Sequence, residues 1–389
     1  MRILQIIDSF SPAIGGPPEA VRQLIRASVA AGDQVEAVCL DDPRAEFLAG
    51  IECPVHALGQ SYLGRYAFSP RLWRWLQQNA GRYDGLVMNG IWSFPGVALS
   101  FAARRAGKPY GIFTHGALDP WFNRTYPLKF LKKLLYWPMQ YMVLRHARAV
   151  FFTTEAERDL AATSFKPNRW NSVVVPYGIM EPETSGVTGE CEEFYGQLPE
   201  LRGRRFLLFL ARMHEKKGCD LLIQAFARVA QQEAGLDLVM AGPDQVGMQA
   251  RLEKMAAQSG VAGRVHWPGM IGGRVKWGAL RACEAVILPS HQENLGISVV
   301  ESLAVGRPVL ISYEVNIWRE IIGDGAGLAE EDTIDGIERL LRRWLALPPV
   351  EREAMAARAQ PCFAARYSMA RAVAAIDCVF AARQPGNQL

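Results

Sequence analysis

The chain has 389 residues, of which 50% are hydrophobic and 21% are charged, and its net charge is +4 at pH 7. This length exceeds one ordinary domain, and the balance is normal for a globular enzyme, so two domains of similar size are expected. The mildly positive charge fits an anionic substrate or an anionic membrane surface, and it is too weak to indicate a nucleic-acid partner.

The cysteines and the N-terminus bear on the location of the protein. Seven scattered cysteines without a Cys-x-x-Cys pair support neither a disulfide framework nor a zinc knuckle, so a reducing cytoplasm is expected. The run Met1–Asp8 is too short for a signal peptide and predicts a first strand. No stretch reaches the roughly 18 apolar residues that span a bilayer. We expect a cytoplasmic protein that at most lies on the inner face of the membrane.

Strands and helices alternate along the chain, which is typical of a parallel sheet covered on both faces. The strands expected in the first half are Ile3–Ile7, Val35–Leu40, Gly85–Met88, Tyr110–Thr114 and Ala149–Thr153. Those expected in the second half are Phe206–Ala211, Leu236–Ala241, Arg264–Trp267, Ala285–Leu288 and Pro308–Ile311. The sequence therefore predicts an α/β protein with two doubly wound, Rossmann-like domains.

A change of composition marks the boundary between these domains. Residues 181–204 are rich in Pro, Gly, Glu and Ser and have little periodicity, which indicates a linker. We expect domains at 1–183 and 184–366, and a helical tail over 350–382 whose end, from about 367, packs back on the first domain. Doubly wound domains carry functional loops at the carboxyl ends of their strands, so a cleft between the domains is the expected active site.

The segment from His291 to Glu301 has the most informative pattern in the chain. Glu293 precedes an expected helix and Glu301 lies within it, on either side of a turn that contains Gly296. The N–H groups at a helix start favour an anion, and the two carboxylates can bind hydroxyl groups. This combination indicates a phosphate attached to sugars, as in a nucleotide sugar.

Two cations follow the first strand of the second domain. Arg212 and Lys217 lie where a diphosphate would bind, and they could stabilise the negative charge that develops on a departing diphosphate without a metal. The alternative is a solvated charge cluster before a helix, which the glutamates downstream disfavour.

These motifs resemble the retaining glycosyltransferases of family 4, which have the GT-B fold. The resemblance rests on Arg212-x4-Lys217-Gly218, on Glu293–Ile297 and on Glu301. It extends over nearly the whole chain through Ser11–Pro18, Thr114–Trp121, Asn316–Ile322 and Arg366–Ser368. Two positions depart from the family pattern, because Ala211 stands where Gly is common and Leu295 stands where Phe is common.

The resemblance implies a role for each matching residue. Glu293 would bind a hydroxyl of the donor sugar, and Glu301 would hold the ribose hydroxyls. The backbone of Asn294, Leu295 and Gly296 would approach the diphosphate together with Arg212 and Lys217. In the first domain, His115 would meet the donor sugar, and the turn at Gly15 and Gly16 would face the diphosphate and the acceptor. The predicted catalytic residues are therefore His115, Arg212, Lys217 and Glu293.

The same resemblance implies the reaction: transfer of a hexose-type sugar, with retention, from a nucleotide diphosphate sugar to a glycan or lipid-linked acceptor in polysaccharide biosynthesis. It implies a front-face reaction without a protein nucleophile. The chain has no D-x-D motif, the usual carboxylate pair for a nucleotide-bound metal in other glycosyltransferases, which agrees with metal-independent chemistry. No cofactor is expected.

Other functions can be compared with the same motifs. Glycosidase acid/base pairs normally lie on different strands or loops, unlike Glu293 and Glu301. The loop at Gly15 is not G-x-G-x-x-G, which argues against an NAD- or FAD-dependent enzyme. A nucleotide-sugar 2-epimerase and a non-catalytic glycan or nucleotide-sugar binding protein stay open. A lone histidine such as His115 is often only structural, but its position before Gly at a strand end favours function; the other histidines are assigned no role.

A basic amphipathic segment spans Leu128–Trp137. On a helical wheel Lys129, Lys132 and Lys133 share one arc and the apolar residues occupy the other, so the segment could lie on anionic lipid. We favour the alternative, in which the apolar side packs in the core and the lysines face water. Backbone groups near Trp267–Met270 are expected to recognise the donor base, so side chains do not identify it. The sequence also does not identify the sugar, the acceptor or the oligomeric state.

Overall fold

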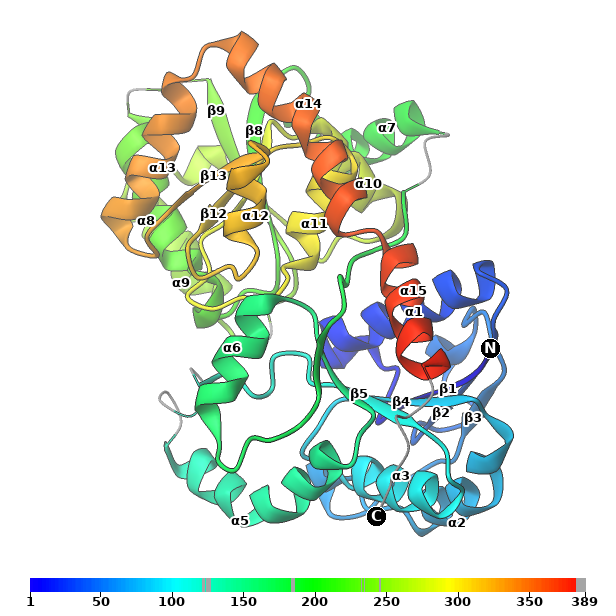
Figure 1. Ribbon diagram of the computed structural model, residues 1–389. Coiled ribbons are helices and arrows are strands. Elements are labelled where there is room, and N and C mark those ends of the chain that lie inside the picture. Colours follow the sequence, from blue (N-terminus) through cyan, green and yellow to red (C-terminus); the bar gives the residue numbers. More distant parts are fainter. Residues whose placement is uncertain are drawn as a thin grey trace. The chain divides into compact units, whose positions relative to one another are not determined.

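The computed structural model describes residues 1–120, 123, 127–182, 186–231, 233, 235–244 and 246–382, without the side chains of 127, 129 and 132. The chain forms two compact units. Unit 1 consists of Met1–Met180 and the segment that begins at Ser368, and unit 2 is Glu181–Tyr367. Each unit is a parallel sheet with helices (Figure 1), which confirms the predicted α/β, doubly wound class.

Unit 1 has the strand order β3-β2-β1-β4-β5-β6-β7, and all of its strand pairs are parallel. The central strands are continuous apolar runs because both of their faces are covered. The strands are β1 (Arg2–Ile7), β2 (Gln34–Cys39), β3 (Val55–Ala57), β4 (Gly85–Asn89), β5 (Tyr110–Phe113), β6 (Ala149–Phe152) and β7 (Ser172–Val174).

The helices of unit 1 lie on both faces of its sheet. Figure 1 shows α1 and α15 on one face and α2 and α3 on the other. The helices are α1 (Gly16–Ala30), α2 (Pro70–Asn79), α3 (Phe94–Arg105), α5 (Pro127–Arg145), α6 (Glu155–Ser164) and α15 (Met369–Ala381).

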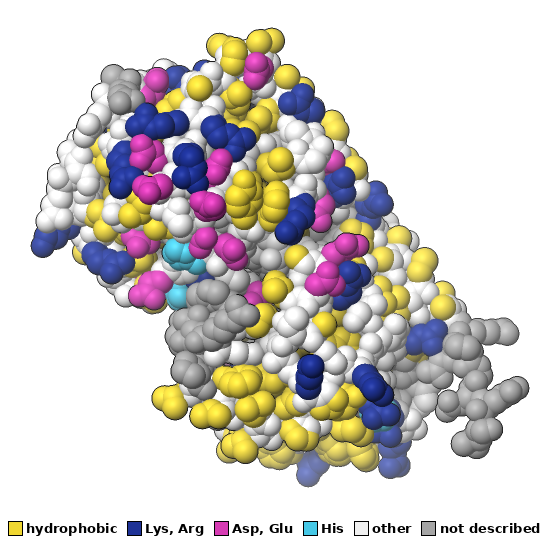
Figure 2. Space-filling view, turned by 60° about the vertical axis from the view of Figure 1, so that its left-hand side comes forward, with side chains coloured by type: hydrophobic (Ala, Val, Ile, Leu, Met, Phe, Trp, Pro, Cys, Tyr) yellow, Lys and Arg dark blue, Asp and Glu magenta, His cyan; other side chains and the backbone are white. Residues whose placement is uncertain are grey.

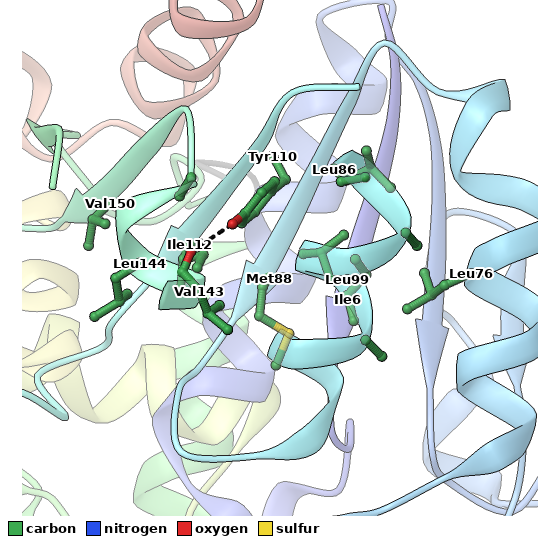
Figure 3. Packing of buried hydrophobic residues seen from close by; sticks show 14 of the residues in the cluster. Ile6, Leu76, Leu86, Met88, Leu99, Tyr110, Ile112, Val143, Leu144 and Val150 are labelled. Carbon is green, nitrogen blue, oxygen red and sulfur yellow. Dashed lines mark hydrogen bonds between the residues drawn. The ribbon is translucent and has the colours of Figure 1, made fainter. Parts of the chain in front are cut away.

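The core of unit 1 joins the sheet to α2, α3 and α5. Figure 3 shows Leu76 and Leu99 packed towards Met88 of β4. The hydroxyl of Tyr110 lies inside this core and donates to the Val143 carbonyl of α5 at 2.7 Å. A buried hydroxyl needs such a partner, and this one ties the start of β5 to α5.

Unit 2 has the strand order β10-β9-β8-β11-β12-β13, again with parallel pairs. Its strands are β8 (Arg205–Leu210), β9 (Leu236–Ala241), β10 (Val265–Gly269), β11 (Ala285–Leu288), β12 (Val309–Ser312) and β13 (Gly327–Glu330). Its helices are α7 (Val187–Gln197), α8 (Cys219–Ala230), α9 (Gln249–Gln258), α10 (Gly273–Ala282), α11 (Ile297–Ala304), α12 (Trp318–Gly323), α13 (Ile334–Ala346) and α14 (Pro349–Arg366).

Two expectations about the connections need correction. Residues 181–204 are not only a linker, because α7 forms there and packs on α10, where Arg281 pairs with Glu190 at 2.8 Å. The tail over 350–382 is not one helix, because α14 ends at Arg366 and α15 starts at Met369. The break follows from a backbone hydrogen bond of 3.0 Å between the Met369 N–H and the Ile179 carbonyl, which turns the chain into unit 1.

The favoured orientation of the basic segment is also wrong. Within α5, Leu128 is 81% and Leu135 is 83% exposed, whereas Trp137 is buried. Lys133 is half-buried, and its Nζ lies 5.0 Å from the ring centre of Trp92. The larger aromatic surface around Trp137 determines which side packs inward, and the lysine stem can pack along it. The side chains of Lys129 and Lys132 lie outside the described residues.

The length and composition of the described helices bear on whether they could cross a bilayer. None of them combines the length and the apolar character that crossing it requires.

Candidate functional site

In each sheet the strand order reverses between two neighbouring strands, and the loops that leave those strands carry predicted residues. In unit 2 the reversal lies between β8 and β11, which pair directly. Arg212 follows β8 and Glu293 follows β11. Such a switch point opens a crevice at the carboxyl edge of a parallel sheet, where ligands bind.

The loops after β8 and β11 in unit 2 are packed against each other. Gly218 has φ +65°, and a Cβ there would lie 2.0 Å from the Pro289 carbonyl oxygen. The N–H of His291 donates to the Lys216 carbonyl at 2.9 Å. The short helical turn Glu215–Lys217 thus ends at a position that only glycine can fill. This packing brings together two motifs that are some 75 residues apart in the sequence.

The Lys217 ammonium donates to Oε2 of Glu293, and both side chains are largely buried. Oε1 of Glu293 accepts from the Asn294 N–H at 3.1 Å. Burial opposes ionisation of Glu293, but the charge and hydrogen bond of Lys217, with help from Lys216 and the Asn294 amide, hold its pKa below the ordinary value. Glu293 is therefore a carboxylate at neutral pH.

The start of α11 lies directly after this ion pair. Gly296 is its N-terminal capping residue with φ +68°, and a Cβ there would lie 3.3 Å from Cγ of Glu293. The first N–H groups of a helix have no acceptor within the helix, so this end of α11 favours an anion. Leu295 is buried and packs where a larger aromatic side chain is common in the family.

Arg212 follows the carboxyl end of β8, in the same loop as Lys217. Its charge, after burial, contributes to lowering the pKa of His214. The backbone beside it is crowded: a Cβ on Gly242 would lie 1.9 Å from the Ala211 carbonyl oxygen. The absence of a side chain at Gly242 therefore lets the backbone of Ala211 and Arg212 pass close to it.

Glu301 lies one turn further along α11 and is buried. Its Oε1 accepts from Nζ of Lys276, on α10, at 2.5 Å. Unit 2 therefore presents a second buried carboxylate paired with a lysine near the same helix start. The sequence interpretation did not include Lys276, because its position in α10 follows no recognisable spacing.

In unit 1 the predicted glycine turn follows β1. Gly15 has φ +107° and ψ −138°, a conformation open essentially to glycine alone, and it caps α1. Gly16 is the first residue of α1, and an added Cβ would meet no atom within 4 Å. Only Gly15 is therefore required by the backbone.

His115 follows β5 and has φ +46°. Its Nε2 lies 3.3 Å from Oδ1 of Asn89, whose Nδ2 donates to the Ile6 carbonyl at 3.3 Å. A backbone carbonyl only accepts, so the Asn89 amide is oriented with its oxygen towards the histidine. The His115 nitrogen that faces it must therefore carry the hydrogen.

Burial lowers the pKa of His115 to about 4, although the nearby Glu157 carboxylate acts to raise it. At neutral pH the ring is neutral and, because Nε2 carries the proton, Nδ1 is an acceptor. A neutral ring with a lone pair can accept a hydrogen bond from a sugar hydroxyl. Asn89 was not predicted, although a polar residue at the end of a buried strand was a signal for it.

Over the described residues, no group of three or more His, Cys, Asp or Glu side chains is placed to hold a metal ion.

The chain is similar to known families over most of its length. Residues 15–178 match the family described as glycosyl transferase 4-like domain, and residues 192–361 match glycosyl transferases group 1. Together the two matched segments cover the greater part of both units.

Among characterised proteins, an alpha-D-kanosaminyltransferase of Streptomyces kanamyceticus is 30% identical over 49% of this chain and 48% of its own length. A D-inositol 3-phosphate glycosyltransferase of Actinosynnema mirum is 30% identical over 56% and 53%. The chain thus spans about half the length of these relatives. A GDP-mannose:cellobiosyl-diphosphopolyprenol alpha-mannosyltransferase of Xanthomonas campestris is 25% identical over 80% and 78%.

Solved structures share the fold at low identity. HepE of Anabaena in complex with UDP-glucose is 18% identical, with a TM-score of 0.77 over 98% of this chain and 99% of that one. A sucrose-phosphate synthase of Thermosynechococcus elongatus is 17% identical, with a TM-score of 0.76 over 98% of both chains. With the two family matches and the paired parallel sheets, the chain belongs to the group 1 glycosyltransferases of the GT-B fold, with a family 4-like N-terminal unit.

Proposed function

We propose that this protein is a retaining glycosyltransferase that moves a hexose-type sugar from a nucleotide diphosphate sugar to a glycan or lipid-linked acceptor. The observation that carries the proposal is the packed pair of loops in unit 2, where Lys217, Glu293 and the start of α11 meet. Cations and helix amides suit a diphosphate, and the buried carboxylates suit sugar hydroxyls. The name of the Xanthomonas campestris mannosyltransferase specifies the nucleotide sugar GDP-mannose as its donor.

The proposed reaction takes place on one face of the donor sugar. The bond between the anomeric carbon and the diphosphate oxygen breaks, and the acceptor oxygen bonds to that carbon from the same side. The acceptor proton passes to the leaving diphosphate. Arg212 and Lys217 stabilise the charge that develops on the diphosphate, so we propose that no metal is required. Lys217 then contacts both Glu293 and the leaving group.

The first experiment measures thermal unfolding with UDP, GDP and ADP, each in EDTA and then with Mg²⁺. A diphosphate at about 100 times its dissociation constant should add roughly 2.7 kcal/mol of stability. Stabilisation by one of them in EDTA supports a metal-independent donor site and identifies the base. Stabilisation only with Mg²⁺ would contradict metal independence, and no stabilisation by any of them would contradict the donor site.

A pair of lysine variants makes this experiment specific. Lys217→Gln should remove most of the stabilisation by the diphosphate. Lys254→Gln, at an exposed lysine of α9 in the same unit, changes the charge equally and should leave it intact. The anomeric configuration of the product, read by NMR, tests retention. An inverted product would contradict the front-face reaction.

We further propose that α5 places unit 1 on an anionic membrane, where a lipid-linked acceptor would lie. Its solvent side carries a row of apolar side chains at helical spacing, namely Leu128, Leu131, Leu135, Met139 and Met142. Hydrophobic side chains gather on the lower part of the surface in Figure 2, with Lys and Arg beside them. An exposed apolar row of this extent marks an interaction surface.

Charge selects the partner of this surface. Between residues 60 and 154 the chain has thirteen Lys or Arg and two Asp, a net charge of +11, against +4 for the whole chain. An apolar row within a positive segment is complementary to lipid with anionic headgroups. This charge would oppose pairing with a second copy of the same surface.

Vesicle binding tests this surface. The protein should sediment with phosphatidylglycerol vesicles and not with phosphatidylcholine vesicles, and high salt should weaken the binding. Replacing Leu128 and Leu135 by Gln should reduce binding at least tenfold, whereas Val350→Gln, at an exposed apolar residue of unit 2, should not. Equal binding to both lipids, or a change of oligomeric state in the leucine variant, would contradict a membrane role.

A further inference from the structure

Glu157 is a buried carboxylate on α6 that faces the His115 loop. It is 3% exposed. Its Oε1 accepts from the Thr114 hydroxyl at 2.6 Å and from the Gly116 N–H at 2.7 Å. Its Oε2 accepts from the N–H and the hydroxyl of Thr153 at 2.8 and 2.9 Å. One side chain thus joins the carboxyl ends of β5 and β6.

These bonds hold the two residues that flank His115. His115 has a positive φ, a backbone conformation that is unfavourable for a non-glycine residue and persists only when the surroundings impose it. On the far side of the turn, the Trp92 indole N–H donates to the Ala117 carbonyl at 3.2 Å. The His115 turn is therefore fixed from both sides, with Glu157 as the buried acceptor.

The hydrogen bonds specify a carboxylate at this position. Each oxygen of Glu157 accepts from one backbone N–H, of Gly116 or of Thr153, and a backbone N–H cannot accept in return. A glutamine would therefore turn its NH2 group towards one of these N–H groups in either orientation. A buried donor without an acceptor is destabilising, so the loop would move to relieve the mismatch.

We propose that Glu157 is a positioning residue for sugar transfer, acting through the His115 turn. The inference rests on the proposed glycosyltransferase function. Glu157 itself does not touch substrate: it fixes the backbone of Gly116, and thereby the direction in which His115 presents Nδ1. Its loss should reduce turnover without weakening the binding of the nucleoside diphosphate, which the proposed function assigns to unit 2.

The test compares Glu157→Gln with a matched buried carboxylate. Glu190 is also buried on a helix, pairs with Arg281 in unit 2, and has no part in the site, so Glu190→Gln is the control. Turnover is measured as the rate at which UDP is released from UDP-glucose, or GDP from GDP-mannose. Glu157→Gln should lower kcat at least tenfold, with the Kd for the diphosphate unchanged, and Glu190→Gln should change kcat less than twofold.

A double-mutant cycle separates positioning from general destabilisation. If Glu157 acts through His115, Glu157→Gln should cost less than twofold in a His115→Ala background. An equal cost in both backgrounds would overturn the proposal. Thr114→Val removes one donor to Glu157 and keeps the backbone, so it replaces Glu157→Gln in the cycle if that variant does not fold.

The ring of His115 gives a readout that does not depend on turnover. In ¹⁵N spectra, assigned by difference against His115→Ala, the native ring should be the neutral form protonated at Nε2. Glu157→Gln should disturb this signal, and Glu190→Gln should not. An undisturbed His115 signal in Glu157→Gln would overturn the proposal. If the wild type binds no nucleoside diphosphate, the proposed function fails, whatever the ring signal shows.

Discussion

At the residue scale, the two glycines after β1 have different reasons to be glycine. Gly15 holds a backbone conformation that other residues avoid, and Gly16 does not. Gly15→Ala should therefore destabilise the protein by about 1–3 kcal/mol in urea unfolding. Gly16→Ala should leave stability within roughly 0.5 kcal/mol, because an Ala is compatible with the first turn of α1. If Gly16→Ala still lowers turnover at least tenfold, the donor or acceptor must approach that backbone closely; full activity would contradict its predicted binding role.

The pH dependence of the free energy of unfolding should reflect two groups whose pKa values are shifted in opposite directions. They follow the carboxyl ends of β1 and β5 in unit 1. Burial raises the pKa of Asp8 from 3.8 to about 6, and burial lowers that of His115 from 6.5 to about 4. Between these values the unfolded state binds more protons at the histidine and fewer at the aspartate, so stability gained from His115 as pH rises is offset at Asp8. The contributions of these two groups to the free energy of unfolding should therefore largely cancel over this window.

Single substitutions should separate the two contributions. Asp8→Asn removes the offset to the histidine contribution, so stability should rise more steeply than in the wild type as the pH goes from about 4 to 6.5. In His115→Gln stability should fall as the pH goes from about 4 to 6, because the protonated form of Asp8 is lost. Urea midpoints at pH 4.5 and 6 measure both. Parallel profiles for the two variants would contradict the opposed shifts.

Arg212 tests the electrostatic part of the proposed reaction. Arg212→Ala should lower kcat by roughly 10²–10³, by analogy with the loss of one preorganised donor at a developing charge. Arg228→Ala, at an exposed arginine of α8 that pairs with Asp335 and Glu338, removes the same charge from the same unit and should have little effect. A loss below tenfold at Arg212 would remove it from the catalytic role.

At the element scale, the sequence predicted the central strands of both sheets and missed short edge strands. β1 and β8 are long apolar runs because both faces are covered, and this pattern is readable without a structure. β3, β7 and β13 have three or four residues and lie at sheet edges, where burial imposes little pattern. The helix α7 was missed because its sequence is polar and Gly-containing, and its contacts lie on α10.

The candidate site divides in a similar way. Residues with chemical character beside a strand end, such as Arg212 and Glu293, could be predicted from their order along the chain. Groups that hold other residues of the site could not be predicted. Lys276, which pairs with Glu301, and Glu157, which accepts from the Thr114 hydroxyl, come from helices whose spacing carries no such signal. The orientation of α5 was mispredicted because a helical wheel shows only which residues share a side of the helix. It does not show that Trp137 is buried while several leucines stay exposed.

The contact between α7 and α10 gives a prediction at this scale. A Cβ on Gly278 would lie 2.0 Å from the Glu190 carbonyl oxygen, so Gly278→Ala must move the helices apart. We expect a loss of about 1–3 kcal/mol in urea unfolding, as for an overpacked core. Gly263→Ala meets no atom within 4 Å and is the control. Equal stability of the two variants would contradict the close packing.

At the scale of the whole molecule, unit 1 is assembled from two distant parts of the chain. The ring of Phe380 on α15 occupies the space that a side chain at Gly85 would need, and Arg148 donates to the Val379 carbonyl at 3.3 Å. Phe380→Ala should cost roughly 3–5 kcal/mol. Hydrogen exchange should then rise in peptides of unit 1, with the unit 2 peptides as internal control. Faster exchange in unit 2 alone would contradict this assignment of α15.

The origin of α15 has a consequence for how the protein is made. Synthesis proceeds from the N-terminus, and domains of a nascent chain generally fold as units once they are complete. β1, α1 and β4 are made first, but α15, which packs against α1, follows the whole of unit 2. Synthesis of unit 2 is therefore complete before that of unit 1, although unit 1 is begun earlier, so the packing of α15 on α1 must follow the synthesis of unit 2.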